Sequence, residues 1–215
     1  MQILDSDNAS LFKVDLALVL AVDCSSSVDA GDFQLQRTGI SAALRNAPLL
    51  AAIKAGPNQR VAMTLILWAN RRSQIVAVPW RIIGDKNDIE GFAEEAEQAT
   101  RNGLSGGTGL AAALDFCVNI IQVLPFMAAR RTIDVSGDGE DNEDGDVDTA
   151  RLAAAALGIT INGLPIIDGS PRIENYYRAH VIAGPGAFAI PAINILAFST
   201  AMTQKLLREI QDQNV

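Results

Sequence analysis

Asp23, Ser25 and Ser27 are the residues of this chain best suited to binding a metal cation. They alternate along a short polar stretch that directly follows the apolar run at residues 16–22. Such a uniformly apolar run is typical of a strand buried on both faces of a parallel sheet, and these sheets place ligands at the carboxyl ends of their strands. On a turning loop, this spacing can direct three oxygen atoms to one point. Oxygen ligands suit Mg²⁺ or a similar cation.

Two further candidate ligands lie far along the chain. Thr108 stands in the glycine-rich stretch at residues 102–109, just before a predicted helix, and Asp138 follows a strand predicted at residues 131–136. Because loops that follow the strands of a parallel sheet can open on one edge, we expect both residues to meet Asp23 there. Three sequence-distant loops would then form a single site.

The pattern of elements predicts a doubly wound, Rossmann-like α/β fold. Its sheet would be mostly parallel with one antiparallel edge strand, and helices would cover both faces. The turn at residues 70–72 is too short for a parallel crossover, so the strands that flank it are expected to form the hairpin at that edge. Strands are predicted at residues 12–22, 61–68, 74–80, 131–136, 159–164 and 187–190. Helices are predicted from residue 30, at 88–100, from 110, and at 147–157, 173–180 and 193–211.

The composition indicates one globular domain over residues 1–215, with its core at about residues 14–211. The chain is 49% hydrophobic and has no linker rich in Pro, Gly or Ser. Its formal net charge of -8 argues against nucleic acid as a partner. The longest apolar run is too short for a membrane span. Cys24 and Cys117 are expected to be buried free thiols.

Two loops resemble other ligand-binding motifs only in part. The glycine-rich loop lacks the Lys-Ser/Thr of a P-loop, since Leu110 follows its last glycine. The acidic run at residues 140–148 matches the first positions of an EF-hand calcium loop, but Arg151 stands where a bidentate glutamate is required. We expect a solvated acidic loop that favours the start of the next helix, with a second cation site as the alternative.

Two other ionisable residues are expected to be structural. Asp134 interrupts an apolar strand, and a buried carboxylate there must be paired or hydrogen-bonded by a partner that the sequence does not name. His180 is the single histidine, so a Ser-His-Asp hydrolase would need it together with a serine at residues 25–27. The chain has no Gly-x-Ser-x-Gly motif, so we expect a satisfied or solvent-facing histidine.

The candidate ligands resemble the metal-ion-dependent adhesion site of the von Willebrand factor type A (VWA) domain. The motif of that family is Asp-x-Ser-x-Ser, followed by a distant Thr and by a distant Asp after a strand. The matching residues here are Asp23, Ser25, Ser27, Thr108 and Asp138. The resemblance covers about residues 14–211, and the sequences at 136–139, 176–178 and 184–188 are similar to those of a bacterial, largely uncharacterised branch.

The resemblance implies a non-enzymatic module that binds proteins through a metal ion. Ser25 and Ser27 would coordinate Mg²⁺, or else Mn²⁺ or Ca²⁺, directly. Thr108 would bind directly or through water, while Asp23 and Asp138 would supply two negative charges. One position would remain for an exposed Asp or Glu carboxylate of a protein or peptide partner.

Two further expectations come from the resemblance. Contact at Thr108 would be linked to movement of the terminal helix at residues 193–211. Members of the bacterial branch often carry signal peptides, which implies a secreted, periplasmic or cell-envelope location, with a cytoplasmic location as the alternative.

The alternative function is a Mg²⁺-dependent phosphatase of the haloacid-dehalogenase type, with Asp23 as nucleophile. Residues 137–142 resemble the late Gly-Asp-Gly-x-x-Asp loop of that family. Its general acid, however, would fall at Ser25, which cannot donate a proton as a carboxylic acid does. Arg130 and Arg131 lie at the wrong end of the strand to replace its lysine. The sequence therefore favours binding over phosphoryl transfer.

Overall fold

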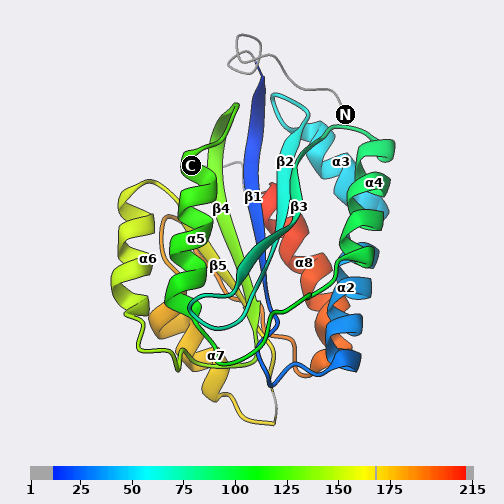
Figure 1. Cartoon of the computed structure of the whole chain (residues 1–215). Coiled ribbons are helices and arrows are strands. Elements are labelled where there is room, and N and C mark those ends of the chain that lie inside the picture. The colour runs from blue at the N-terminus through cyan, green and yellow to red at the C-terminus, as the bar shows by residue number, and fades with distance from the viewer. Residues whose placement is uncertain (1–11, 168, 212–215) are drawn as a thin grey trace.

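A five-stranded sheet forms the middle layer of the structure (Figure 1). The computed structural model describes residues 12–167 and 169–211. The strand order is β3-β2-β1-β4-β5, which places β1 at the centre of the sheet. The strands are β1 (Lys13–Asp23), β2 (Val61–Trp68), β3 (Gln74–Ile83), β4 (Met127–Gly137) and β5 (Thr160–Pro165).

The central strand β1 runs parallel to both of its neighbours. Ala17 pairs with Ala62 of β2 on one side and with Arg131 of β4 on the other. β5 is parallel to β4, whereas β3 is antiparallel to β2, which confirms the predicted hairpin at one edge. Every residue of β1 after Lys13 is buried, because helices cover both faces of the sheet. The carboxyl ends of β1, β2, β4 and β5 therefore share one edge.

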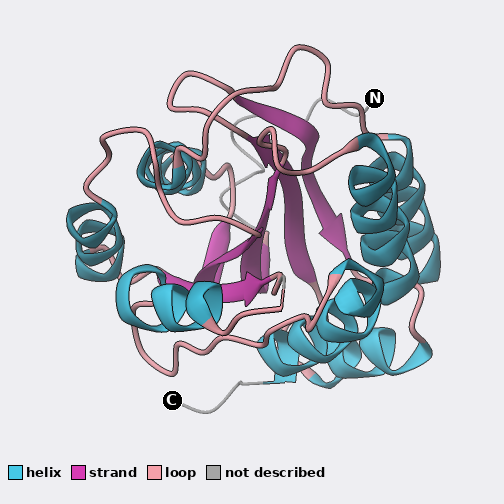
Figure 2. Cartoon of the chain, turned by 90° about the horizontal axis from the view of Figure 1, so that it is seen from below, coloured by secondary structure: helices cyan, strands magenta, loops and turns pink. Residues whose placement is uncertain are grey.

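Two helical layers enclose the sheet (Figure 2). In the first layer, α2, α3, α4 and α8 pack around a core that includes Leu18, Phe92 and Phe198. In the second layer, α5 and α6 pack with the segment around Tyr177 against the other face. The helices are α2 (Ala30–Leu44), α3 (Ala47–Ala55), α4 (Lys86–Gln98), α5 (Leu110–Gln122), α6 (Val147–Ala156), α7 (Arg172–Tyr176) and α8 (Phe198–Gln211).

The alternation of side chains along β1 decides which layer Asp23 faces. Leu20 and Val22 belong to the core beneath α2 and α8, whereas Val19 and Ala21 belong to the core beneath α5. Because successive side chains of a strand point to opposite faces, Asp23 faces the α5 layer. α2 begins soon after, at Ala30, and Asp29 caps it as predicted by accepting a 2.8 Å hydrogen bond from the Asp32 N–H.

The prediction of a strand at residues 187–190 is wrong. Isolated bridges join Ala189 to Gly163 and Ala192 to Ile166, so the segment runs beside β5 without forming a continuous ladder. Gly186 just before it has a φ of 68°, which turns the chain away from an extended path. Pro191 just after it has no N–H to donate. A short apolar run was therefore not sufficient to form a strand.

Three helical segments also differ from the prediction. The terminal helix α8 begins at Phe198 rather than at residue 193, because Ile195–Ala197 forms a 3₁₀ turn capped by Asn194. Helix α3 was not predicted; a proline in its first turn starts it directly after α2 ends. The helix predicted at residues 173–180 divides into α7 and a π-helical turn, Tyr177–Val181.

Candidate metal-binding site

The residues that follow β1 form a tight loop at the carboxyl edge of the sheet. Asp23 is fully buried, and its Oδ1 accepts a 2.7 Å hydrogen bond from the Ser25 N–H. The Val28 N–H donates to the Ser25 carbonyl at 3.0 Å and closes the turn. Ser25 is buried and Ser27 is exposed, so the loop leads from the core to the surface.

Ser27 joins this loop to Asp138. The Ser27 hydroxyl donates to Asp138 Oδ1 at 2.7 Å, and the Oγ atoms of Ser25 and Ser27 are 3.2 Å apart. Asp138 directly follows β4, which pairs with β1, so the two strands end side by side. The structure thus brings into contact the two motifs that the sequence separates by more than a hundred residues.

Thr108 reaches the same edge through the glycine-rich loop. Ser26 holds that loop in place, since its N–H and its hydroxyl both donate to the Gly106 carbonyl, at 2.9 and 2.5 Å. A Cβ placed on Gly139 would lie 3.1 Å from Thr108 Oγ1, so the threonine hydroxyl lies against the residue that follows Asp138. The three sequence-distant loops meet at one edge, as predicted.

Asn142 supports Thr108 and was missed by sequence reasoning. The Thr108 N–H donates to Asn142 Oδ1 at 2.8 Å, and the Asn142 N–H donates to the Thr108 carbonyl at 3.0 Å. This paired contact ties the glycine-rich loop to the acidic loop. Asn142 also stands where the last Asp of the dehalogenase-type loop would be, so its amide serves Thr108 where that family has a carboxylate.

The second oxygen of Asp23 is chemically unsatisfied. Asp23 Oδ2 is buried and has no hydrogen-bond partner among the described residues. Burial raises the pKa of Asp23 from 3.8 to about 7; hydrogen bonds from Ser25 oppose this shift, and the nearby charge of Asp138 adds to it. An unpaired buried carboxylate is costly, and a cation beside it would offset that cost. The residues present therefore fit a divalent cation.

The donor set consists of oxygen atoms alone. It comprises the carboxylates of Asp23 and Asp138 and three hydroxyl groups. Among residues 12–167 and 169–211, no group of three or more His, Cys, Asp or Glu is arranged to hold a metal ion, so binding here would depend on the hydroxyls. Burial raises the pKa of the Cys24 thiol to about 12, and its side chain lies in the opposite core. Hard oxygen ligands favour Mg²⁺.

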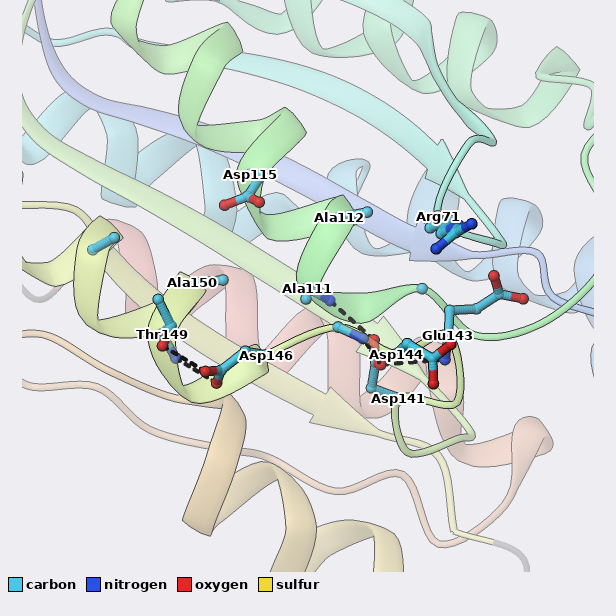
Figure 3. Close-up of a pocket in the computed structure, with 13 residues that line it drawn as sticks. Arg71, Ala111, Ala112, Asp115, Asp141, Glu143, Asp144, Asp146, Thr149 and Ala150 are labelled. Atoms are coloured by element: carbon cyan, nitrogen blue, oxygen red, sulfur yellow. Dashed lines mark hydrogen bonds between the residues drawn. The ribbon is translucent and has the colours of Figure 1, made fainter.

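The acidic run next to the site is held by its own hydrogen bonds (Figure 3). Asp141 accepts from the Ala111 N–H at 3.1 Å, at the start of α5. Asp146 caps α6 by accepting from the N–H and hydroxyl of Thr149, at 2.9 and 2.7 Å, which confirms the predicted role at the next helix. The loop lines a cavity of about 340 Å³. In the described part of the chain, no acidic cluster with metal-binding geometry supports a second cation site there.

Lys205 is the buried partner that Asp134 requires. Its Nζ lies 2.8 Å from Asp134 Oδ1 and 2.6 Å from Glu209 Oε1, and the three side chains are almost completely buried. Asn162 donates a 2.9 Å hydrogen bond to Glu209. Burial and the negative charge of Glu209 raise the pKa of Asp134, because two carboxylates share one ammonium group. This cluster ties α8 to β4 on the face opposite Asp23.

His180 takes no part in the site. Its Nδ1 lies 2.7 Å from Asp148 Oδ2 at the surface, and its ring lies against Tyr176. The histidine is therefore satisfied by an exposed carboxylate, as the sequence predicted. Lys205 is also unable to serve a phosphatase-type site, because its charge is taken up by Asp134 and Glu209 on the other face of the sheet.

The sequence is similar to those of a bacterial, largely uncharacterised branch, and one protein family matches almost the whole chain. The family described as "Protein of unknown function (DUF1194)" matches residues 13–214. The chain belongs to this family. No curated protein matches the sequence.

Several solved structures share the fold of this DUF1194 chain. Proximal thread matrix protein 1 from the mussel byssus, with a zinc-occupied MIDAS motif (the metal-ion-dependent adhesion site), has a TM-score of 0.64 at 15% identity over 92% of this chain and 46% of its own. The von Willebrand factor type A protein from Catenulispora acidiphila has a TM-score of 0.62 at 13% identity over 93% and 43%. BatB from Bacteroides thetaiotaomicron has a TM-score of 0.62 at 18% identity over 91% and 98%.

These similarities establish the fold. The chain has a VWA-like fold, which confirms the predicted fold class. It spans less than half the length of the byssus protein and nearly the whole of BatB. Within the described residues, no helix is long and apolar enough to cross a membrane. Cys24 and Cys117 are buried free thiols, as predicted.

Proposed function

We propose that this chain is a divalent-cation-dependent protein-binding module. The cation is held at the carboxyl edge of the sheet, and an exposed Asp or Glu of a protein or peptide partner completes its shell. The observation that carries the proposal is the contact between the two distant motifs, in which the Ser27 hydroxyl lies 2.7 Å from Asp138 Oδ1. In the same loop as Ser27, Asp23 Oδ2 is buried and has no hydrogen-bond partner among the described residues. The proposed ligands are Asp23, Ser25, Ser27, Thr108 and Asp138.

The ligand chemistry favours Mg²⁺, with Mn²⁺ or Ca²⁺ as substitutes. Two carboxylates balance the charge of a divalent ion, and the hydroxyls supply neutral oxygens. The zinc in the MIDAS motif of the byssus protein supports occupancy of this kind of site by a divalent cation. Zinc itself prefers nitrogen and sulfur ligands, which this donor set lacks.

Exposure of the loop supports a macromolecular partner. Ser26 and Ser27 are exposed and Asp138 is half-buried, so a side chain of another protein can approach the cation from outside. A carboxylate is the appropriate ligand because it is a hard anionic oxygen donor. The site offers no general acid next to Asp23, since residue 25 is a serine, and binding rather than hydrolysis follows from this arrangement.

An extracellular or cell-envelope location is consistent with this function. The byssus protein with the similar fold is a thread matrix protein. For this chain we propose a secreted, periplasmic or cell-envelope location, where a metal-dependent contact with another protein would join neighbouring components.

Calorimetric titration of the metal-free chain with Mg²⁺ and Mn²⁺ tests the proposal. We expect one saturable site per chain for each ion. Paired peptides that differ only by Asp or Asn at one position then test the partner chemistry: the Asp peptide should bind only with metal, and the Asn peptide should not bind. Absence of saturable binding by either ion would contradict the proposal, and so would equal binding of the two peptides.

A further inference from the structure

Tyr177 lies close to Asp23, on the face of the sheet that α5 covers. Its side chain is fully buried, and its hydroxyl has no hydrogen-bond partner among the described residues. A Cβ built on Gly137 would lie 2.8 Å from the Tyr177 hydroxyl and 2.9 Å from Asp23 Oδ2. The two unpartnered oxygens therefore flank the same glycine, close enough for one water molecule to bridge them.

The backbone fixes the position of the tyrosine ring. A Cβ on Gly163 of β5 would lie 2.7 Å from Cδ1 of Tyr177, so the ring packs closely over the strand. Tyr177 begins the π-helical turn, in which the Ile182 N–H donates to the Tyr177 carbonyl at 3.0 Å. Such turns occur often at functional sites. The phenol is thus held at the end of β4 by two glycine contacts and an unusual helical turn.

The chemistry of the two oxygens is complementary. Asp23 Oδ1 already accepts from the Ser25 N–H, whereas Oδ2 accepts from no described residue. A buried phenol that makes no hydrogen bond is costly, and so is a buried carboxylate oxygen without a donor. Burial, together with the charges of Asp23 and Asp138, raises the pKa of Tyr177 well above its usual value, so its hydroxyl keeps the proton that it would donate.

We propose that Tyr177 is a positioning residue of the metal site. Its phenol donates to a water molecule that donates in turn to Asp23 Oδ2, and this bridge fixes the orientation of that carboxylate toward the cation. Gly137 keeps the space between them open, because any side chain there would separate the two oxygens. The inference rests on the proposed function, since it assigns a residue that acts through one of the proposed ligands.

Tyr177→Phe tests the inference with a single atom removed. Replacing a side chain that hydrogen-bonds to a metal ligand typically lowers metal affinity by about 10- to 100-fold. We expect Tyr177→Phe to lower Mg²⁺ affinity by a factor in that range. The melting temperature of the metal-free protein should change little, because phenylalanine keeps the ring that packs over Gly163. Tyr176→Phe is the matched control: its hydroxyl accepts from the Asp141 N–H at 3.3 Å, and its loss should leave Mg²⁺ affinity unchanged.

Near-ultraviolet difference spectra provide a second readout, because the chain has only two tyrosines. Mg²⁺ should change the tyrosine absorbance of the wild type and of Tyr176→Phe, but not that of Tyr177→Phe. Gly137→Ala should lower Mg²⁺ affinity in the same direction as Tyr177→Phe.

The outcomes separate this inference from the proposed function. A wild type that binds Mg²⁺ and a Tyr177→Phe variant that binds it equally well would overturn the inference alone. The same holds if Tyr177→Phe lowers the melting temperature of the metal-free protein and leaves Mg²⁺ affinity unchanged, since the role would then be packing. A wild type that binds neither Mg²⁺ nor Mn²⁺ would overturn the proposed function and this inference together.

Discussion

Replacing Asp23 with asparagine is expected to abolish Mg²⁺ binding and to stabilise the metal-free protein. Asparagine keeps an oxygen that can accept from the Ser25 N–H, but it removes a fully buried carboxylate whose Oδ2 has no partner among the described residues. Relief of that burial should raise the free energy of unfolding by about 1–3 kcal/mol. Loss of a charged ligand should weaken Mg²⁺ binding by at least about 100-fold.

Urea unfolding in EDTA and calorimetric titration with Mg²⁺ measure the two effects of Asp23→Asn. The matched control is Asp29→Asn, which changes an exposed carboxylate in the same loop and retains the cap of α2. That control should alter neither quantity appreciably. Wild-type Mg²⁺ affinity in Asp23→Asn would show that this carboxylate is not a ligand, and a less stable metal-free variant would show that its charge is already compensated in the fold.

Replacing Lys205 with methionine is expected to destabilise the protein strongly. Methionine fills a similar volume but leaves Asp134 and Glu209 as two buried carboxylates without their shared cation. Breaking a buried ion pair in this way costs about 3–5 kcal/mol. The control Lys54→Met, in the last turn of α3, removes an exposed ammonium group and should change stability by less than about 0.5 kcal/mol.

The loss in Lys205→Met should depend on pH in a defined direction. The pKa of Asp134 is already raised by burial and by Glu209, and removal of Lys205 raises it further. A carboxyl group with a raised pKa in the folded state binds protons more tightly there, so stability falls as pH rises through that range. Lys205→Met should therefore recover part of its stability at about pH 5 relative to about pH 8. Urea unfolding at both values checks this, and an equal loss at both would contradict the charge-based explanation.

The sequence was sufficient to locate the candidate ligands because their spacing follows from the fold. A strand buried on both faces, such as β1, is visible as an apolar run, and the residues that follow it must lie at the carboxyl edge. Asp138 could be assigned to the same edge in the same way. The bounds of β2 at Val61–Trp68 were also predictable, because the adjacent turn is short and polar.

The residues that support the site could not be predicted in the same way. Tyr177 depends on a π-helical turn and on two glycine contacts, none of which has a periodic signal in the sequence. Asn142 lies in an acidic loop whose path is set by tertiary hydrogen bonds. Lys205 lies on an amphipathic helix, where a lysine usually indicates the solvent face rather than a buried ion pair. The positions of all three side chains are set by contacts between segments that are distant in the sequence.

The most direct test of the central claim is a crystal structure of the wild-type chain grown with Mn²⁺, with the anomalous scattering of the metal used to locate it. The proposed function predicts one strong peak at the carboxyl edge of the sheet, within about 2.5 Å of the Ser25 and Ser27 hydroxyls. A peak in the acidic loop at residues 140–148 instead, or no peak at the end of β1, would contradict it.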